Sequence, residues 1–146
     1  MKTRTSSLHA NSDEDSRDEE RFRNFLQDMV CARQAELAAV LHPEVVWHLP
    51  PFAQQKPISG ATAVLEFLRE GAAAVYEANS LTLEPALIAV SHGNASCLDT
   101  IRGRLKGGRP YENQYAFFAR MVAGQITEVW EILDSALLLD QLQPKS

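Results

Sequence analysis

The stretch EVWEILD, residues 128–134, is the segment that best indicates how this chain folds. Side chains alternate between the two faces of a strand, so Val129, Glu131 and Leu133 are expected to point the same way. With Val129 and Leu133 in the interior, Glu131 is a carboxylate held among apolar groups. Desolvation there raises its pKa, which suits this side chain to proton transfer.

The opposite face of the same stretch carries Trp130 and Ile132. A large aromatic and an aliphatic side chain exposed together more often mark a subunit interface than bare surface. The pattern therefore predicts a homodimer, packed sheet to sheet through this outer face. A bulge in the strand would reverse the two faces, making Trp130 and Ile132 a core pair and leaving Glu131 as an edge-strand glutamate.

Three similar segments precede this one, each rich in β-branched, aromatic or aliphatic residues. They are separated by Gly93-Asn94, Gly107-Gly108 and Ala123-Gly124. Short glycine-containing loops between successive strands predict an antiparallel meander. The four predicted strands span residues 80–90, 95–105, 111–122 and 126–133.

The first half of the chain has a helical period instead. Ser16 and Glu19 resemble a capping box, and the apolar residues that follow recur at i, i+3, i+4, i+7 and i+8, which predicts an amphipathic helix. Helices first and strands second is the α+β pattern, in which helices cover one face of a curved antiparallel sheet. The other elements expected in this half are a short helix at 36–41, a strand at 45–49 and a longer helix at 61–78.

The chain has 146 residues, 45% of them hydrophobic, which fits one domain with a real core. We place that domain at residues 16–146, after a polar segment, 1–15, that is expected to be a disordered tail. A net charge of -5 without a continuous basic stretch argues against a nucleic-acid partner. The sequence shows no signal peptide and no apolar run of membrane-spanning length, so a cytoplasmic protein with no membrane partner is expected.

The two cysteines give no sign of a metal site. Cys31 and Cys97 have neither a CxxC nor a Cys/His ligand spacing, which argues against a disulfide framework and against zinc. Both are expected to be buried thiols. We therefore expect no metal and no cofactor.

Five motifs, taken in order, resemble a known family. Over residues 18–140 the chain resembles the SnoaL-like branch of the nuclear transport factor 2-like superfamily. The resemblance implies a cone-shaped α+β barrel enclosing a deep hydrophobic pocket. The superfamily includes polyketide cyclases, ketosteroid isomerases, limonene-type epoxide hydrolases, dehydratases and non-catalytic binding proteins, so the fold leaves the reaction open. The motifs are VVWHLP (45–50), SGATAVLEFL (59–68), YENQYAFF (111–118), GQI (124–126) and EVWEILD (128–134).

Two catalytic sets of that superfamily are incomplete here. In ketosteroid isomerases the base is an aspartate just before a proline at the end of the first strand, where this chain has Leu49. The oxyanion-hole tyrosine of those enzymes corresponds to Phe25, which cannot donate a hydrogen bond. In the limonene-type epoxide hydrolases, two acids match Glu131 and Asp99, but the arginine two residues before the second acid is Cys97 here.

SnoaL-like cyclases use an acidic side chain on the pocket wall as the main acid/base, and Glu131 matches that role. Asp99 is either a second pocket acid or a hydrogen-bonded structural group. His48 is either a proton shuttle or an ordinary structural histidine. Asp134 fits a helix N-cap and no chemistry. The residues expected to bind substrate are Tyr115, Asn113, Trp47, Phe117, Met121, Phe25 and Leu49.

Three functions remain open at this stage. The first is a cofactor-free acid/base enzyme of the cyclase or isomerase type, acting on a small hydrophobic molecule of secondary metabolism. The second is an epoxide hydrolase-like activity, with Asp99 and Glu131 activating a water. The third is a ligand-binding or interaction module without chemistry.

Overall fold

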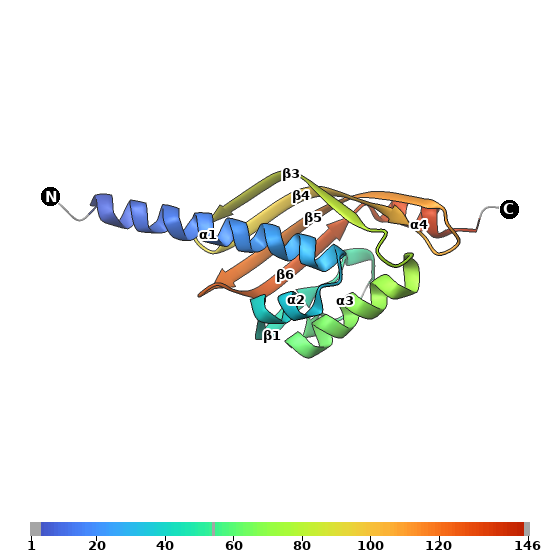
Figure 1. Cartoon of the computed structure of the whole chain (residues 1–146), viewed down its shortest axis with the longest axis horizontal. Coiled ribbons are helices and arrows are strands. Elements are labelled where there is room, and N and C mark those ends of the chain that lie inside the picture. The colour runs from blue at the N-terminus through green and yellow to red at the C-terminus, as the bar shows by residue number, and fades with distance from the viewer. Residues whose placement is uncertain (1–3, 54, 145–146) are drawn as a thin grey trace.

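A six-stranded sheet with three helices across one of its faces forms the body of the molecule (Figure 1). The computed structural model describes residues 4–53 and 55–144. The α+β class expected from the order of the elements is confirmed. The strands are β1 (Leu41–His48), β2 (Ile58–Ser59), β3 (Thr82–Ser91), β4 (Asn94–Arg104), β5 (Pro110–Val122) and β6 (Gln125–Leu133).

The strands lie in the order β2-β1-β6-β5-β4-β3, and the sheet does not close on itself. β3 to β6 form the predicted antiparallel meander. β1, however, runs parallel to β6, with Trp47 opposite Val129, so the sheet is mixed rather than antiparallel throughout. Turn chemistry fixes the direction only of strands joined by short loops, and a helix and four strands separate β1 from β6 in the chain.

The open sheet has two edges, β2 and β3. β2 is only two residues long. β3 contains Pro85, which sits beside a register shift between Pro85 and Leu87. The side chain of Gln27 donates a hydrogen bond to the carbonyl oxygen of Leu83 at 3.1 Å, which ties the first helix to this edge.

The first helix is longer than the sequence indicated. It begins at Arg4, and Ser16 donates a hydrogen bond to the Ser12 carbonyl inside the helix, so Ser16 is not its cap. Residues 4–15 of the segment expected to be a tail thus belong to α1, and residues 1–3 lie outside the described residues. Extending a packed helix needs no new nucleation. The helices are α1 (Arg4–Val30), α2 (Gln34–Val40), α3 (Ala61–Val75) and α4 (Ser135–Leu142), with a short 3-10 turn at Pro51–Ala53.

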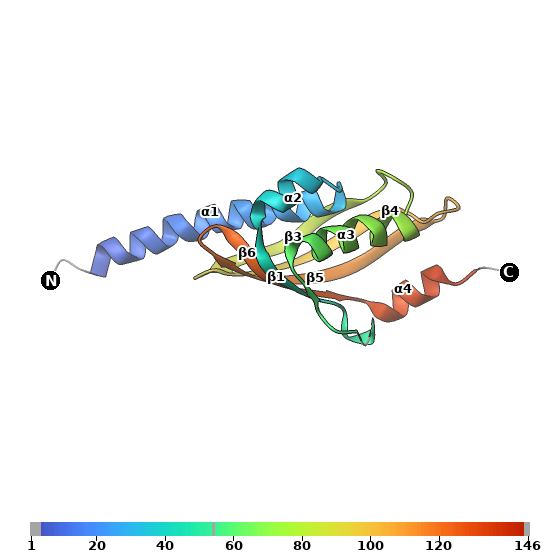
Figure 2. The same cartoon turned by 90° about the horizontal axis from the view of Figure 1, so that it is seen from below.

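The N-terminal part of α1 projects past the sheet, as Figure 2 shows from below. One contact holds the helix near the end of the sheet, where the backbone N–H of His92 donates to the Asp15 carboxylate at 2.9 Å. Asp15 therefore joins α1 to the turn between β3 and β4.

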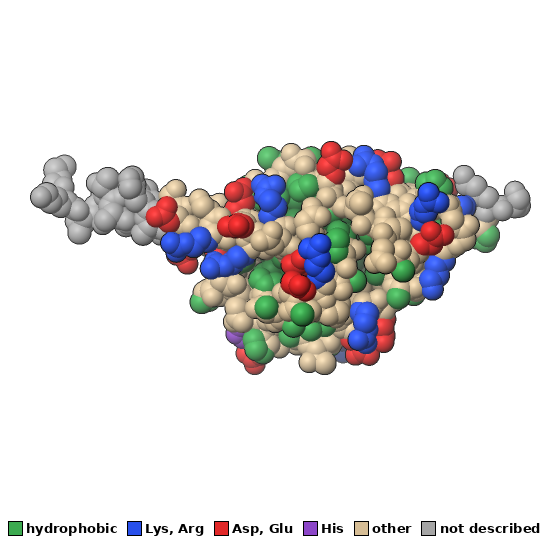
Figure 3. All heavy atoms as spheres, in the orientation of Figure 1, with side chains coloured by type: hydrophobic (Ala, Val, Ile, Leu, Met, Phe, Trp, Pro, Cys, Tyr) green, Lys and Arg blue, Asp and Glu red, His purple; other side chains and the backbone are tan. Residues whose placement is uncertain are grey.

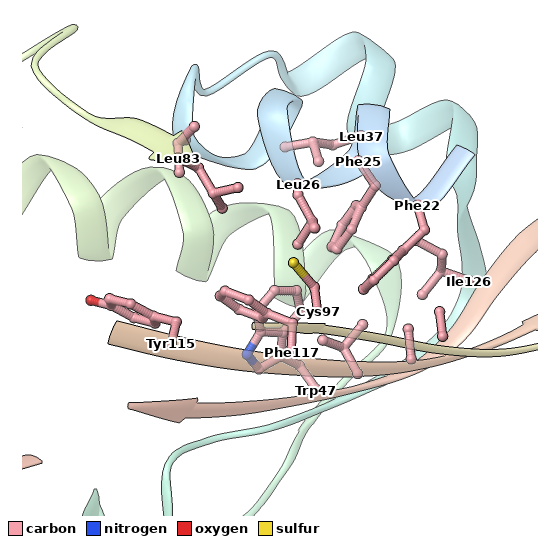
Figure 4. Packing of buried hydrophobic residues seen from close by; sticks show 14 of the residues in the cluster. Phe22, Phe25, Leu26, Leu37, Trp47, Leu83, Cys97, Tyr115, Phe117 and Ile126 are labelled. Carbon is pink, nitrogen blue, oxygen red and sulfur yellow. The ribbon is translucent and has the colours of Figure 1, made fainter. Parts of the chain in front are cut away.

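The core lies between α1 and the inner face of the sheet (Figure 4). The predicted stripe of α1 is confirmed, because Phe22, Phe25 and Leu26 are all at most 1% exposed. Trp47 of β1 is fully buried beside them. Its ring centroid lies 6.2 Å from that of Phe25 and 6.5 Å from that of Phe117.

Charged side chains of both signs are interspersed over the helical face, with apolar side chains between them (Figure 3). Within the described ranges, no helix is long and apolar enough to cross a membrane. Of the two cysteines, Cys97 is buried as expected, but Cys31 is exposed. Cys31 follows the end of α1, where the chain turns away from the core.

Two hairpins have two-residue turns in which both residues have positive φ. His92 and Gly93 join β3 to β4 with φ values of 52° and 76°, and Ala123 and Gly124 join β5 to β6 with 50° and 77°. Turns of this kind match the right-handed twist of the strands they connect. The surroundings differ, because a Cβ at Gly93 would lie 2.5 Å from the Met121 carbonyl oxygen, whereas one at Gly124 would meet only the end of the Arg21 side chain at 3.1 Å.

This contrast predicts unequal costs for two similar substitutions. Gly93→Ala and Gly124→Ala should each lose about 1 kcal/mol of unfolding free energy through the positive φ. Gly93→Ala should lose roughly a further 1–3 kcal/mol, because its methyl group meets backbone that cannot move aside. Urea denaturation of wild type and the two variants measures the loss of unfolding free energy in each variant. Equal losses would contradict the prediction.

Candidate active site

A largely apolar cavity of about 270 Å³ lies between the sheet and the helices. This volume is near the lower end of the ~300–1,000 Å³ typical of small-molecule pockets. The floor comes from β1, β4, β5 and β6, and the walls come from the ends of α1 and α3. The outer rim is formed by the segment after β1 and by α4, through Leu49, Pro50, Phe52, Leu138 and Leu142.

Glu131 is the only carboxylate on the cavity wall among the described residues. Val129 is fully buried on the same side of β6, and Leu133 lines the cavity, so the predicted alternation of this strand is confirmed. Burial raises the pKa of the Glu131 carboxyl group. The Trp47 indole N–H donates a hydrogen bond to its Oε2 atom at 3.2 Å, which acts in the opposite direction on the pKa.

The Trp47 indole is fixed from several sides. Besides Phe25 and Phe117, the ring of Phe67 from α3 lies 6.3 Å from it, centroid to centroid. Aromatic packing of this kind restricts the orientation of a ring. This packing therefore holds the N–H of Trp47 toward Glu131.

Asp99 lies behind the cavity wall rather than on it. It is 1% exposed, and neither carboxyl oxygen has a hydrogen-bond partner among the described residues. Its neighbour across the ladder is Tyr115, which does line the cavity. Burial raises the pKa of Asp99 to about 7, the nearby Cys97 thiol opposes the shift, and the charge of Glu131 adds to it.

Three tyrosines meet at one part of the site. Tyr111 and Tyr115 project from the inner face of β5, and their hydroxyl groups are hydrogen-bonded to each other. Tyr76, immediately after α3, has its ring centroid 4.9 Å from that of Tyr111. Tyr76 and Tyr115 line the cavity, while Tyr111 is only 1% exposed.

The structure places five of the predicted site residues around the cavity. They contribute one carboxylate, two polar aromatic side chains and two purely apolar side chains. They are Glu131, Tyr115, Trp47, Phe117 and Leu49.

The other predicted residues lie elsewhere. His48 faces the outer side of the sheet, where its Nε2 atom is 2.7 Å from the Glu128 carboxylate and its ring stacks on Trp130. Asn113 is buried and donates its amide to the Asp134 carbonyl. Phe25 belongs to the aromatic core beneath Trp47, and Met121 is a buried core residue near the far end of β5. None of these four residues lines the cavity.

Sequence reasoning missed Tyr76 and the rim leucines of α4. Tyr76 follows Leu68 and Ala72 at intervals of four residues, a spacing that places it on the same helical face. Leu138 and Leu142 have the same spacing after the cap. The capping role expected for Asp134 is confirmed, since its side chain accepts a hydrogen bond from the Leu137 N–H at 3.0 Å. Within the described part of the chain, no three His, Cys, Asp or Glu side chains come together as metal ligands.

The raised pKa of Asp99 predicts a pH-dependent stability. Unfolded aspartate has a pKa of about 3.9, so the folded state holds this proton more tightly and loses stability as pH rises through about 7. Asparagine cannot ionise. Asp99→Asn should therefore gain unfolding free energy relative to wild type between pH 5 and pH 8, by roughly 2–3 kcal/mol.

Urea denaturation at the two pH values measures this change. Asp140→Asn, at an exposed carboxyl of α4, is the control and should differ little between them. A stability difference for Asp99→Asn that does not vary with pH would contradict the prediction.

Solved structures share this fold at low sequence identity. An NTF2-like protein of unknown function from Burkholderia pseudomallei is 18% identical, with a TM-score of 0.75 over 88% of this chain and 98% of its own. A proposed SnoaL-like polyketide cyclase from Jannaschia is 11% identical, with a TM-score of 0.77 over 89% and 95%. IdmH, a proposed polyketide cyclase from Streptomyces antibioticus, is 21% identical, with a TM-score of 0.72 over 86% and 97%.

A comparison with the curated proteins finds no significant match. The SnoaL-like domain family matches residues 22–129, which run from the packed part of α1 into the strand that carries Glu131. This match covers most of the chain, and it agrees with the open, helix-covered sheet and its apolar cavity. The chain therefore belongs to the SnoaL-like domain family.

Proposed function

We propose that this protein is a cofactor-free acid/base enzyme that acts on a small hydrophobic molecule with a carbonyl oxygen. The observation that carries the proposal is Glu131, a single carboxylate with a raised pKa on the wall of an apolar cavity. Perturbed carboxyl groups in apolar clefts are typical of general acids and bases. The proposed cyclases among proteins of this fold are consistent with such chemistry.

The proposed reaction begins with proton abstraction. The Glu131 carboxylate removes a proton from a carbon next to the carbonyl group, and the electron pair of the broken C–H bond moves into an enolate. Returning the proton to a different carbon gives an isomer. Attack of the enolate carbon on a second carbonyl of the same molecule gives a ring, and the new alkoxide then takes the proton from Glu131.

The hydrogen bond from Trp47 helps Glu131 both to remove a proton from the substrate and to return it. The indole N–H stabilises the carboxylate form through the 3.2 Å hydrogen bond, against the desolvation that favours the protonated form. Burial and this hydrogen bond act on the pKa of Glu131 in opposite directions, and a carboxyl group with a raised pKa can return the proton that it accepts. The apolar walls exclude bulk water, which would otherwise protonate the enolate.

The two alternative functions fit the geometry less well. Water activation by Asp99 and Glu131 needs both carboxyl groups at one water, and Asp99 does not line the cavity. A binding or interaction module without catalytic activity would be favoured by a closed core in which Glu131 forms an ion pair with an arginine. Instead, Glu131 accepts a hydrogen bond from the Trp47 indole, and it lies on the wall of a cavity lined mainly by apolar side chains.

Carbon-bound deuterium exchange tests the proposed base directly. 2-Tetralone in D₂O should lose its α-proton NMR signals faster with wild type than with buffer. Glu131→Gln should reduce the protein-dependent rate by about a hundredfold or more, since general-base catalysis contributes ~10²–10⁴.

Glu128→Gln is the matched control, because Glu128 lies on the same strand but pairs with His48 on the outer face. It should keep the wild-type rate. The assignment of Glu131 as the base would be overturned if wild type exchanged the protons no faster than buffer alone, or if wild type and Glu131→Gln gave equal rates.

We further propose that two copies pair through the outer face of the sheet. Four exposed or partly exposed apolar side chains lie there in adjacent rows, because Leu98 and Ile132 both flank Ala116 while Trp130 lies opposite Phe118. Leu98, Phe118 and Ile132 are 43–45% exposed. α1, α2 and α3 occupy the other face, so this apolar surface is left for a second copy.

A charge placed in this surface should separate the copies. Wild type should sediment at twice its 16.2 kDa chain mass at micromolar concentration. Trp130→Lys should shift the equilibrium to monomer, because burying an unpaired ammonium group is costly. Ala38→Lys, at an exposed position of α2, should stay dimeric. A monomeric wild type, or a dimeric Trp130→Lys, would argue against this interface.

A further inference from the structure

All the tyrosines of this chain lie in one cluster. The sequence contains three, and they are Tyr76, Tyr111 and Tyr115. Tyr111 and Tyr115 are four residues apart on β5, so both project from its inner face. Tyr76 reaches the same place from the end of α3, an element far away in the chain. The fold therefore gathers every phenol group of the protein at one part of one cavity.

The hydroxyl groups differ in access to the cavity. Tyr111 is 1% exposed and does not line it, whereas Tyr76 and Tyr115 do. A hydroxyl group has one proton to donate and two lone pairs that accept. When the buried Tyr111 donates to Tyr115, the O–H of Tyr115 remains available to a ligand. Figure 4 shows the Tyr115 hydroxyl pointing away from the aromatic core.

The cluster is a donor of neutral hydrogen bonds over a wide pH range. Burial is the main cause that raises the pKa of both Tyr76 and Tyr115 above the ordinary tyrosine value. Tyr111 raises both pKa values further, and Tyr76 also raises that of Tyr115, whereas the hydrogen bond with Tyr115 lowers that of Tyr76. Both phenols therefore keep their protons near neutral pH and can donate to an oxygen atom.

Glu131 shares the cavity with these donors. Its charge is among the causes that raise the pKa of Tyr76, so the two groups lie within electrostatic reach of each other. Apart from Trp47, whose N–H is already directed at Glu131, the remaining lining side chains are apolar. In this cavity the phenol groups can donate hydrogen bonds to an oxygen atom of a ligand, and the Glu131 carboxylate can accept a proton from a neighbouring C–H group.

We propose that the hydroxyl groups of Tyr76 and Tyr115, supported from behind by Tyr111, bind the carbonyl oxygen of the substrate and stabilise it as it becomes an enolate. This inference rests on the proposed function, because it takes Glu131 as the base. Donors fixed where negative charge develops are among the largest contributions to such reactions. With a cavity of about 270 Å³, the substrate class is a compact enolisable ketone with one or two rings.

Two probes of the same shape test the oxygen site without any turnover. 2-Tetralone has a carbonyl oxygen, and tetralin has the same two rings without it. Isothermal titration calorimetry gives the ratio of their dissociation constants for each protein. Wild type should bind 2-tetralone about tenfold more tightly, the effect of one or two neutral hydrogen bonds.

Removal of either lining hydroxyl should reduce this ratio. Tyr115→Phe and Tyr76→Phe should each lower it to about threefold or less, and Tyr111→Phe, which acts only through the other two, should lower it by a smaller amount. Glu128→Gln is the control, because Glu128 pairs with His48 on the outer face of the sheet and does not line the cavity, so it should leave the ratio near the wild-type value. The ratio compares two ligands on one protein, so a uniform loss of folded material does not alter it.

Infrared spectroscopy gives a second measurement that needs only wild type. The carbonyl stretch of bound 2-tetralone should move to lower wavenumber than in hexane, as expected for an accepted hydrogen bond. An unshifted band, no detectable binding of 2-tetralone at millimolar concentration, or an unchanged ratio in both Tyr76→Phe and Tyr115→Phe would overturn the proposal.

The oxygen site and the base can fail independently. Glu131→Gln should abolish deuterium exchange but leave the affinity ratio near the wild-type value. Wild type that binds 2-tetralone with the expected ratio but does not exchange its protons would refute the base and keep the oxygen site. Exchange that depends on Glu131 while the ratio is insensitive to both tyrosines would refute the oxygen site alone.

Discussion

The hydrogen bond from the Trp47 indole to Glu131 joins the parts of this structure that matter most for its cavity. It crosses the parallel pair of β1 and β6, and it supplies the one described polar contact of the carboxylate. A buried carboxylate without any partner is costly to keep charged. The aromatic residues that hold Trp47 come from α1, α3 and β5, so the position of Glu131 depends on packing in every layer of the fold.

β6 separates two kinds of surface by alternation alone. Val129, Glu131 and Leu133 face the helices, while Trp130 and Ile132 face outward. A shift of register by one residue would place the carboxylate outside and the tryptophan in the cavity. The inner face can therefore hold a ligand without competing with the surface that the outer face offers to a second copy.

Most of the local structure could be predicted from the sequence, but few of the contacts between residues far apart in the chain could. Strand alternation and glycine turns predicted the meander and the inward direction of Glu131, because both are properties of neighbouring residues. They could not predict that β1 lies parallel to β6. His48 faces outward for a local reason: it follows Trp47 directly on β1, so a strand that turns Trp47 toward the cavity turns His48 away from it. Asp99 was placed on the correct face, but only packing decides whether such a face meets a cavity or solid core. Tyr76 was missed because its partners, Tyr111 and Tyr115, are more than thirty residues away.

The edges of the sheet have a consequence for the behaviour of the protein at high concentration. An open sheet presents unpaired backbone groups that can recruit strands from other molecules. Here one edge is the two-residue β2, and the other, β3, contains a proline beside its irregular register and carries α1 alongside it. Proline has no N–H to offer an added strand. Both features disfavour open-ended, amyloid-like addition of strands at the edges of this sheet, which does not close into a barrel.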